Sequence, residues 1–294
     1  MAAGTFQKVA AAMTTPILAF LNQCASAAAV LGAAGRLAAA LPAAEIIAFH
    51  IRPGPRGDLM PSEEIMTEAD FAARVAEIET RAAALKEIFH TWQASHAPIR
   101  ARFVSPEGET AERLLEAAQE AAFIVLARPP AYHYADSRVA LHTALFRARR
   151  PVLLVPPDPL AESLGRHPAI AIKPGAFDPE GPTARAIAAA LPLLNRAAEV
   201  DILVAEADTN PAEPAPAIAA LLARLRGDGV PARLDRFARG AEETGRALLA
   251  RAHVRGADLL IMGAYGRGEV VEFILGGVTR SLLAAADLPV LLRH

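Results

Sequence analysis

The sequence of 294 residues is poor in cysteine and has no long apolar run. Its one cysteine, Cys24, excludes a disulfide within the chain and is typical of a protein in a reducing compartment. No run approaches the roughly 18 apolar residues of a membrane-spanning helix, and the N-terminal segment lacks the order of charge, apolar run and cleavage site of a signal peptide. We therefore expect a cytoplasmic protein without a membrane partner.

Excess charge of one sign and aromatic side chains are also scarce. The chain has 30 lysines and arginines against 32 aspartates and glutamates, which gives a formal net charge of -2. This balance supplies no electrostatic reason to expect a nucleic acid as partner. Aromatic residues make up 5% of the chain and hydrophobic residues 53%, many of them alanine. The composition predicts a globular protein with closely packed helices.

The usual spacings of catalytic and metal-binding residues are absent as well. The histidines have no ligand-like spacing with cysteine or carboxylates, which argues against a metal site. The sequence has no Ser-His-Asp order, no paired acids and no Walker lysine. We therefore expect no catalytic residue, no metal ligand and no fast enzyme. Cys24 is expected to be inert and partly buried.

Apolar runs alternate with helical patterns along the chain, which predicts an α/β fold with a parallel sheet. In the first half, strands are expected at 17–21, 45–51, 99–104, 122–127 and 151–155, and helices at 26–41, 67–94, 110–120 and 139–148. Thr67 and Asp70 have the spacing of a capping box at the start of the longest helix. One apolar stripe of that helix is expected to be buried: Phe71, Val75, Ile78, Ala82, Leu85 and Phe89.

The same order of elements then starts again. Strands are expected at 169–172, 200–205, 232–237, 258–262 and 289–292, and helices at 183–191, 218–226, 242–252 and 278–285. Ala-Ala-Ala-Leu-Pro ends at Pro42 and at Pro192, and Pro-Val-Leu-Leu begins at Pro151 and at Pro289. A period of about 140–150 residues indicates two domains of one fold, because solenoid repeats span only roughly 20–50. We predict tandem Rossmann-like domains at 1–157 and 166–294. Each would hold its own five-stranded parallel sheet with helices on both faces, the two sheets being related by an approximate two-fold axis.

Glycine residues gather after the expected strand at 258–262. Gly263, Gly266 and Gly268 interrupt the chain there, and Gly276 and Gly277 precede the last helical pattern. Glycine allows a ligand to approach the backbone and leaves N–H groups free to face an anion. A helix start favours phosphate for the same reason, so this stretch is a candidate phosphate-binding segment.

The stretch resembles the universal stress protein family, whose nucleotide-binding members carry Gly-x-x-Gly, nine residues, and then Gly-Ser or Gly-Thr. Gly263, Gly266 and Gly276 have that spacing after Met262, whereas Gly277 stands where the hydroxyl residue is expected. Through the internal repeat the resemblance covers almost the whole chain. It implies two adenine nucleotide alpha hydrolase-like domains and, as cofactor, ATP or another adenine nucleotide.

The resemblance also implies where the nucleotide would lie, at the carboxyl ends of the strands in the second domain. The adenine would lie near the first two strands and the phosphates over the glycines. The residues expected at this site are Lys173, Ala205, Met262, Gly263, Gly266, Arg267, Gly268, Gly276, Gly277, Val278 and Thr279. Lys173 replaces the aspartate of the family's nucleotide binders. It would neutralise a phosphate directly, so nucleotide affinity should depend little on magnesium.

The first domain lacks this motif. Ala127–Ala131 takes the place of Met262–Gly266 with two prolines and no glycine, and Asn22 stands at the aspartate position. Proline has no N–H to offer a phosphate, so we expect no nucleotide in the first domain. Family members pair through their last strands, which implies that 151–155 and 289–292 pair within the chain as an intramolecular pseudo-dimer. A homodimer is the other association to consider.

Three functions follow as hypotheses. The first is a cytoplasmic stress-response protein that binds an adenine nucleotide without strong turnover. The second is a scaffold that has lost nucleotide binding in both domains, and the third is a slow ATP hydrolase. Gly263, Gly266 and Gly276 favour the first hypothesis, whereas Lys173 and Gly277 favour the second.

Overall fold

The computed structural model describes residues 14–54, 67–128, 135–156, 163–172, 177–207, 214–264 and 277–294. The strands of the first half are β1 (Thr15–Phe20), β2 (Ala44–Phe49), β3 (Arg100–Val104), β4 (Phe123–Ala127) and β5 (Val152–Val155). Its helices are α1 (Cys24–Ala40), α2 (Glu68–Ser95), α3 (Thr110–Ala118) and α4 (Ala135–His142), which continues as the π-helical turn η1 (Thr143–Arg147). The strands of the second half are β6 (Pro168–Ile172), β7 (Val200–Glu206), β8 (Ala232–Ala238), β9 (Leu259–Gly263) and β10 (Val290–Arg293). Its helices are α5 (Pro182–Leu194), α6 (Pro216–Gly227), α7 (Thr244–Val254) and α8 (Gly277–Ala285).

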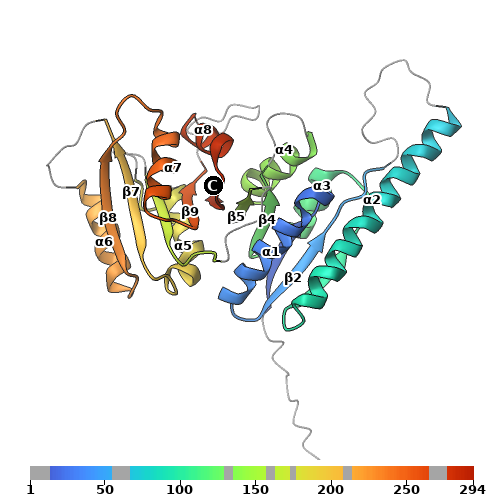
Figure 1. The fold of residues 1–294 in the computed structure, drawn as a ribbon, viewed down its shortest axis with the longest axis horizontal. Coiled ribbons are helices and arrows are strands. Elements are labelled where there is room, and N and C mark those ends of the chain that lie inside the picture. Colours follow the sequence, from blue (N-terminus) through green and yellow to red (C-terminus); the bar gives the residue numbers. More distant parts are fainter. Residues whose placement is uncertain are drawn as a thin grey trace, which may run out of the picture.

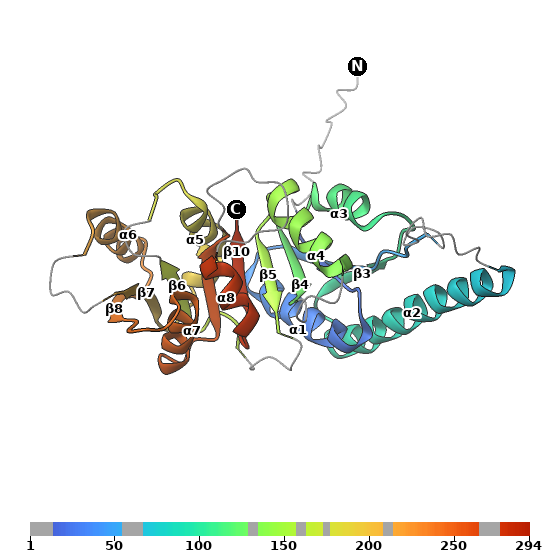
Figure 2. The same cartoon turned by 90° about the horizontal axis from the view of Figure 1, so that it is seen from above.

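The two halves share one sheet, so the predicted separation into two sheets is wrong. Among the described residues, ten strands form a single sheet in the order β3-β2-β1-β4-β5-β10-β9-β6-β7-β8 (Figure 1). Each half is parallel throughout and five-stranded, as the sequence predicts. The halves meet where β5 and β10 run side by side in opposite directions (Figure 2).

The residue pairs between β5 and β10, which form the joint between the two halves, are arranged symmetrically. Leu153 lies opposite Leu291, and the flanking pairs are Val152 with Leu292 and Leu154 with Val290. Both strands read Val-Leu-Leu at these positions, so exchanging the two halves leaves the set of residue pairs unchanged. An approximate two-fold axis therefore passes through the pair Leu153–Leu291. Each strand covers the apolar edge that the other would otherwise expose.

Strand alternation sends side chains into two apolar cores, one on each face of the sheet. One core holds residues of α1, α2, α5 and α6. The other holds residues of α3, α4, η1, α7 and α8. Both cores contain residues from both halves of the chain, and Leu153 and Leu291 lie in the first of them. The β5–β10 joint is thus part of hydrophobic cores that both halves share, rather than an interface between two separately packed domains.

Helix α2 begins at the predicted capping box and extends past the sheet (Figure 1). Thr67 Oγ1 accepts a hydrogen bond from the Asp70 N–H at 3.2 Å, and Asp70 Oδ2 accepts one from the Thr67 N–H at 3.1 Å. The predicted buried stripe holds from Ile78 onward, but Phe71 is 37% exposed. The first turns of α2 have no sheet beneath them, so their apolar side chains stay near solvent.

Helix α5 continues beyond its predicted end at residue 191. It runs to Leu194 with Pro192 inside its last turn. In the first half, the matching Pro42 follows the end of α1 at Ala40. Proline removes one N–H from the helix ladder, yet Asn195 N–H still bonds to Leu191 O at 2.9 Å. Pro42 therefore lies after the end of its helix, whereas the equivalent Pro192 lies inside its helix.

Candidate ligand site

The described part of the predicted site lies at the carboxyl edge of β7 and β9 and at the start of α8. In the sheet, β6 lies between β9 and β7, so Met262 and Ala205 end on either side of it. Both side chains are buried, at 5% and 1% exposure. The site residues outside the described part are Lys173, Gly266, Arg267, Gly268 and Gly276.

Gly263, the last residue of β9, lies directly against the first turn of α5. A Cβ atom at this position would be 2.6 Å from Thr183 N and 2.8 Å from Thr183 Oγ1. Real side chains do not approach so closely, so only glycine lets the backbone of α5 come this near. Gly263 therefore has a packing role whether or not a ligand binds.

The first turn of α8 presents one face to solvent and one to the core. Gly277 is exposed, and no described atom lies within 4 Å of the Cβ that a side chain would add there. Thr279 is 1% exposed and Val278 is half-buried. The first N–H groups of a helix have no partner inside it. The first turn of α8 thus combines the positive end of a helix dipole with a Gly277 position that no described atom crowds.

Gly245 in α7 positions α8, and the sequence alone did not identify this role. A Cβ at Gly245 would be 2.5 Å from Val278 O and 2.9 Å from Leu282 N. The two helices therefore cross backbone to backbone at the first turns of α8. The available signal was a glycine inside a predicted helix, where alanine would be about 1 kcal/mol more favourable.

Alanine substitutions should separate the packing glycines from Gly277. Gly263→Ala and Gly245→Ala are each expected to lower the free energy of unfolding by about 1–3 kcal/mol, because the added methyl meets backbone atoms. Gly277→Ala should be neutral or stabilising by up to about 1 kcal/mol, since its methyl meets open space in a helix. Urea unfolding followed by circular dichroism measures all three. Similar stabilities for the three variants would contradict the close approaches described above.

The first half has an arginine near the matching place, and the alignment used in the sequence prediction is off by one residue. Ala127 pairs with Val155, and Gly263 pairs with Arg293 at the same point of the repeat. Ala127 thus corresponds to Gly263, not to Met262. Arg128 follows it, and its Nη1 donates to the carbonyls of Leu283 at 3.3 Å and Ala284 at 3.2 Å. A side chain of the first half therefore caps the last turn of α8, where a cation is favoured.

Two further findings concern groups that could carry chemistry. Cys24 is exposed at the first residue of α1, so the expectation that it would be partly buried is wrong. Within the described ranges, no cluster of three or more histidine, cysteine, aspartate or glutamate residues could hold a metal ion.

None of the helices in the described part of the chain is long and apolar enough to span a membrane.

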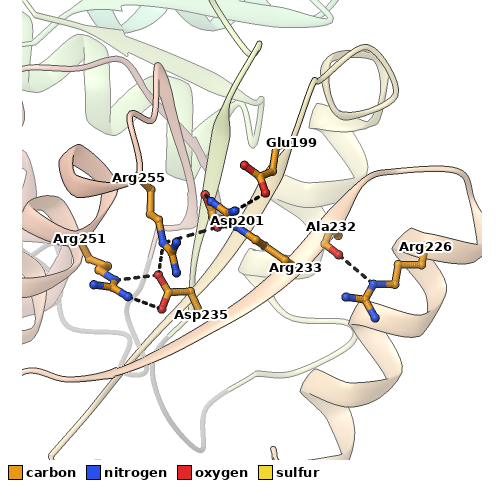
Figure 3. A network of polar contacts seen from close by, with 8 residues as sticks. All are labelled: Glu199, Asp201, Arg226, Ala232, Arg233, Asp235, Arg251 and Arg255. Atoms are coloured by element: carbon orange, nitrogen blue, oxygen red, sulfur yellow. Dashed lines mark hydrogen bonds and ion pairs between the residues drawn. The ribbon is translucent and has the colours of Figure 1, made fainter.

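An ion-pair network lies on β7, β8 and α7 of the second half (Figure 3). Asp235 accepts two hydrogen bonds from Arg251, at 2.7 and 2.8 Å, and one from Arg255. Asp201 is bound by Arg233, with Nη2 at 3.1 Å from Oδ2. The network balances three carboxylates with three guanidinium groups: Glu199, Asp201, Asp235, Arg233, Arg251 and Arg255. This balance indicates a structural role rather than a charged ligand site.

The pKa of Asp235 reflects this arrangement. Burial by itself would raise the pKa, because the side chain is only 4% exposed. The hydrogen bonds and charges of Arg251 and Arg255 outweigh burial and lower the pKa from 3.8 to about 2. Asp235 is therefore ionised over the whole neutral range.

Comparison with known proteins agrees with this architecture. The fold defines an α/β protein built from two similar halves, and residues 176–294 match the model of the Universal stress protein family. The second half of the chain therefore carries the sequence pattern of the universal stress protein family. None of the curated proteins matches the sequence.

Solved structures share the fold over both halves. A universal stress protein from Archaeoglobus fulgidus DSM 4304 aligns with a TM-score of 0.70 at 17% identity, covering 95% of each chain. The cytoplasmic domain of a prokaryotic cation chloride cotransporter aligns with a TM-score of 0.52 at 12% identity, again over 95% of each chain. At such identities the likeness is one of fold.

Proposed function

We propose that the protein is a cytoplasmic stress-response module that binds an adenine nucleotide in its second half without strong turnover. The observation that carries this proposal is the first turn of α8, where no described atom lies within 4 Å of a Cβ added at Gly277, at the positive end of a helix. The spacing of Gly263, Gly266 and Gly276 and the family match over residues 176–294 support it.

A scaffold without nucleotide is the second candidate, and one specific observation favours it. Gly263 is required by its approach to Thr183 even in the absence of a ligand. Its presence is thus explained equally well by packing. Denaturing the purified protein and analysing the supernatant by mass spectrometry tests whether it retains a nucleotide. Calorimetric titration with ATP, with and without magnesium, then measures the affinity. Binding that depends little on magnesium, without hydrolysis, is the expected result; absence of binding would leave the scaffold, and steady hydrolysis would indicate an enzyme.

Restoring the missing hydroxyl should strengthen nucleotide binding. Gly277→Ser places a donor at the first turn of α8, in space that no described atom occupies. One added hydrogen bond corresponds to about a two- to tenfold gain in affinity. Gly277→Ala is the matched control, because it has the same effect on the helix backbone without the hydroxyl. Equal ATP affinity in the serine and alanine variants would contradict the proposed position of the phosphates.

A further inference from the structure

Arg128 of the first half is bonded to the helix that carries the proposed phosphate site. Its Nη1 donates to the carbonyl oxygens of Leu283 at 3.3 Å and Ala284 at 3.2 Å, in the last turn of α8. Its backbone is fixed beside the β5–β10 joint, because the Arg128 N–H donates to the Val155 carbonyl at 2.7 Å, at the end of β5. The side chain therefore ties the frame of the first half to a helix of the second half.

Helix α8 depends on such contacts for its position, because it is short. It has nine residues, and isolated helices of fewer than about 12–15 residues are marginal in water. Its core face is packed in the second half, where Gly245 lets α7 approach the backbone of the first turns. Arg128 holds the opposite end. Since nine residues span only about 13 Å, a displacement of the last turn also displaces the first.

The repeat places an alanine where the first half has Arg128. The Ala264 N–H donates to the Arg293 carbonyl at 2.8 Å, as the Arg128 N–H donates to the Val155 carbonyl, so the two residues hold equivalent positions. An alanine side chain has no N–H to donate. The end of the equivalent helix in the first half, η1, therefore receives no capping bond from the side chain at this position.

The two helix ends differ in their backbone hydrogen bonds. Ala148 and Ala286 each stand three residues before the repeated proline, so their positions are equivalent. The Ala286 N–H donates to Leu282 O at 2.8 Å, with the ordinary α-helical spacing of four residues. The Ala148 N–H donates to Thr143 O at 2.8 Å, five residues back, in the π-helical turn η1. The end that Arg128 caps is thus the one that keeps regular α-helical bonding.

We infer that Arg128 is a positioning residue for the phosphate site of the second half. By holding the last turn of α8, it keeps the N–H groups of the first turn in place beside Gly277. The inference rests on the proposed function, and it does not place Arg128 in contact with the nucleotide, because the guanidinium group lies at the other end of the helix. It makes the first half, for which no nucleotide is expected, a working part of the site in the second.

Hydrogen exchange on the full chain tests the hold on α8 without any nucleotide. In Arg128→Gln, the amide groups of residues 281–286 should exchange about two- to tenfold faster, the factor that one or two capping bonds supply. Mass spectrometry of peptides that cover α8 measures the rates. Arg128→Lys should exchange within about threefold of wild type, because one nitrogen makes both bonds and an ammonium group can replace it. Equal rates in wild type and Arg128→Gln would overturn the inference.

Calorimetric titration of the same variants with ATP and adenosine tests the effect on the phosphate site. Arg128→Gln should bind ATP about two- to tenfold more weakly and adenosine as tightly as wild type, since adenosine has no phosphate to place over α8. Arg128→Lys should recover most of the ATP affinity. A general loss of structure would weaken both ligands alike, so an equal loss for ATP and adenosine, or none for ATP, contradicts the inference.

Arg102→Gln is the matched control. It removes a guanidinium group from β3, at the far edge of the sheet, where the Arg102 side chain is 54% exposed. Its exchange rates in α8 and both affinities should equal those of wild type. A wild-type protein that binds no ATP would contradict the proposed function, and the exchange rates would still decide whether Arg128 holds α8. Should Arg128→Gln fail to fold, ATP must slow exchange at residues 283–286 of wild type, because coupling is reciprocal, and unchanged exchange there contradicts the inference.

Discussion

Replacing Leu291 with aspartate is expected to destabilise both halves of the protein together, lowering the free energy of unfolding by about 4–5 kcal/mol. Leu291 is 1% exposed and lies opposite Leu153 in the antiparallel joint. A carboxylate there would be buried without a partner in a core that extends across both halves. The cost therefore combines lost apolar contact with an unpaired charge.

The single tryptophan makes the coupling between the halves measurable. Trp92 lies in α2 of the first half and is 8% exposed, so its fluorescence reports on that half. In urea, the fluorescence transition of Leu291→Asp should move to lower concentration together with the circular dichroism transition. Leu291→Met, which conserves volume, should cost less than about 1.5 kcal/mol. A variant whose tryptophan transition stays at the wild-type midpoint would show that the halves fold independently.

Asp235→Asn is expected to cost about 2 kcal/mol at neutral pH and nothing below about pH 2. The pKa of Asp235 is lowered from 3.8 to about 2 in the folded protein, because bonds and charges from Arg251 and Arg255 outweigh burial. A lowered folded-state pKa gives stability that is present above the unfolded value. That stability disappears as the pH falls through the folded value. The asparagine variant has no such contribution to lose.

The measurement is the difference in unfolding free energy between wild type and Asp235→Asn from pH 7 to pH 2. The difference should be constant down to about pH 4 and then shrink. Glu116→Gln is the matched control, since the Glu116 side chain is 62% exposed in its pair with Arg113. Exposed pairs contribute at most about 1 kcal/mol, so this variant should stay close to wild type. A difference for Asp235→Asn that does not vary with pH would mean that the carboxylate is not ionised in the pair.

The fold was largely predictable from the sequence because most of its strands, such as β5 and β9, are short apolar runs. The capping box at Thr67 and the repeated Pro-Val-Leu-Leu can likewise be recognised in short stretches of the sequence. The family resemblance implied that residues 151–155 and 289–292 pair, and β5 and β10 do pair. What was not predicted is that this pairing joins the two halves into one continuous sheet. Periodicity shows that β5 is buried, but it does not distinguish burial by helices on both faces from pairing along an edge. That distinction depends on which strand faces Leu153, a contact between residues far apart in sequence.

The candidate sites were less predictable, for a related physical reason. The glycines after β9 were found by spacing, yet spacing does not show that Gly263 meets the backbone of Thr183. His50 was noticed only as a histidine without metal-ligand spacing. Its burial and its hydrogen bond to the Leu21 carbonyl depend on how β1 and β2 pair, which spacing does not show. Such contacts are created by the sheet register and by how the helices pack on the sheet, and neither is a local property of the sequence.

The place of β5 in the sheet also has a consequence for synthesis on the ribosome. Val152–Val155 leaves the ribosome before any strand of the second half, yet its neighbour β10 is made after all the other strands that the structure describes. Until then the growing chain carries an unpaired, wholly apolar edge strand, the kind of edge that pairs with other chains. We therefore expect this edge of β5 to be the part of the nascent chain most prone to association with other chains until β10 is made.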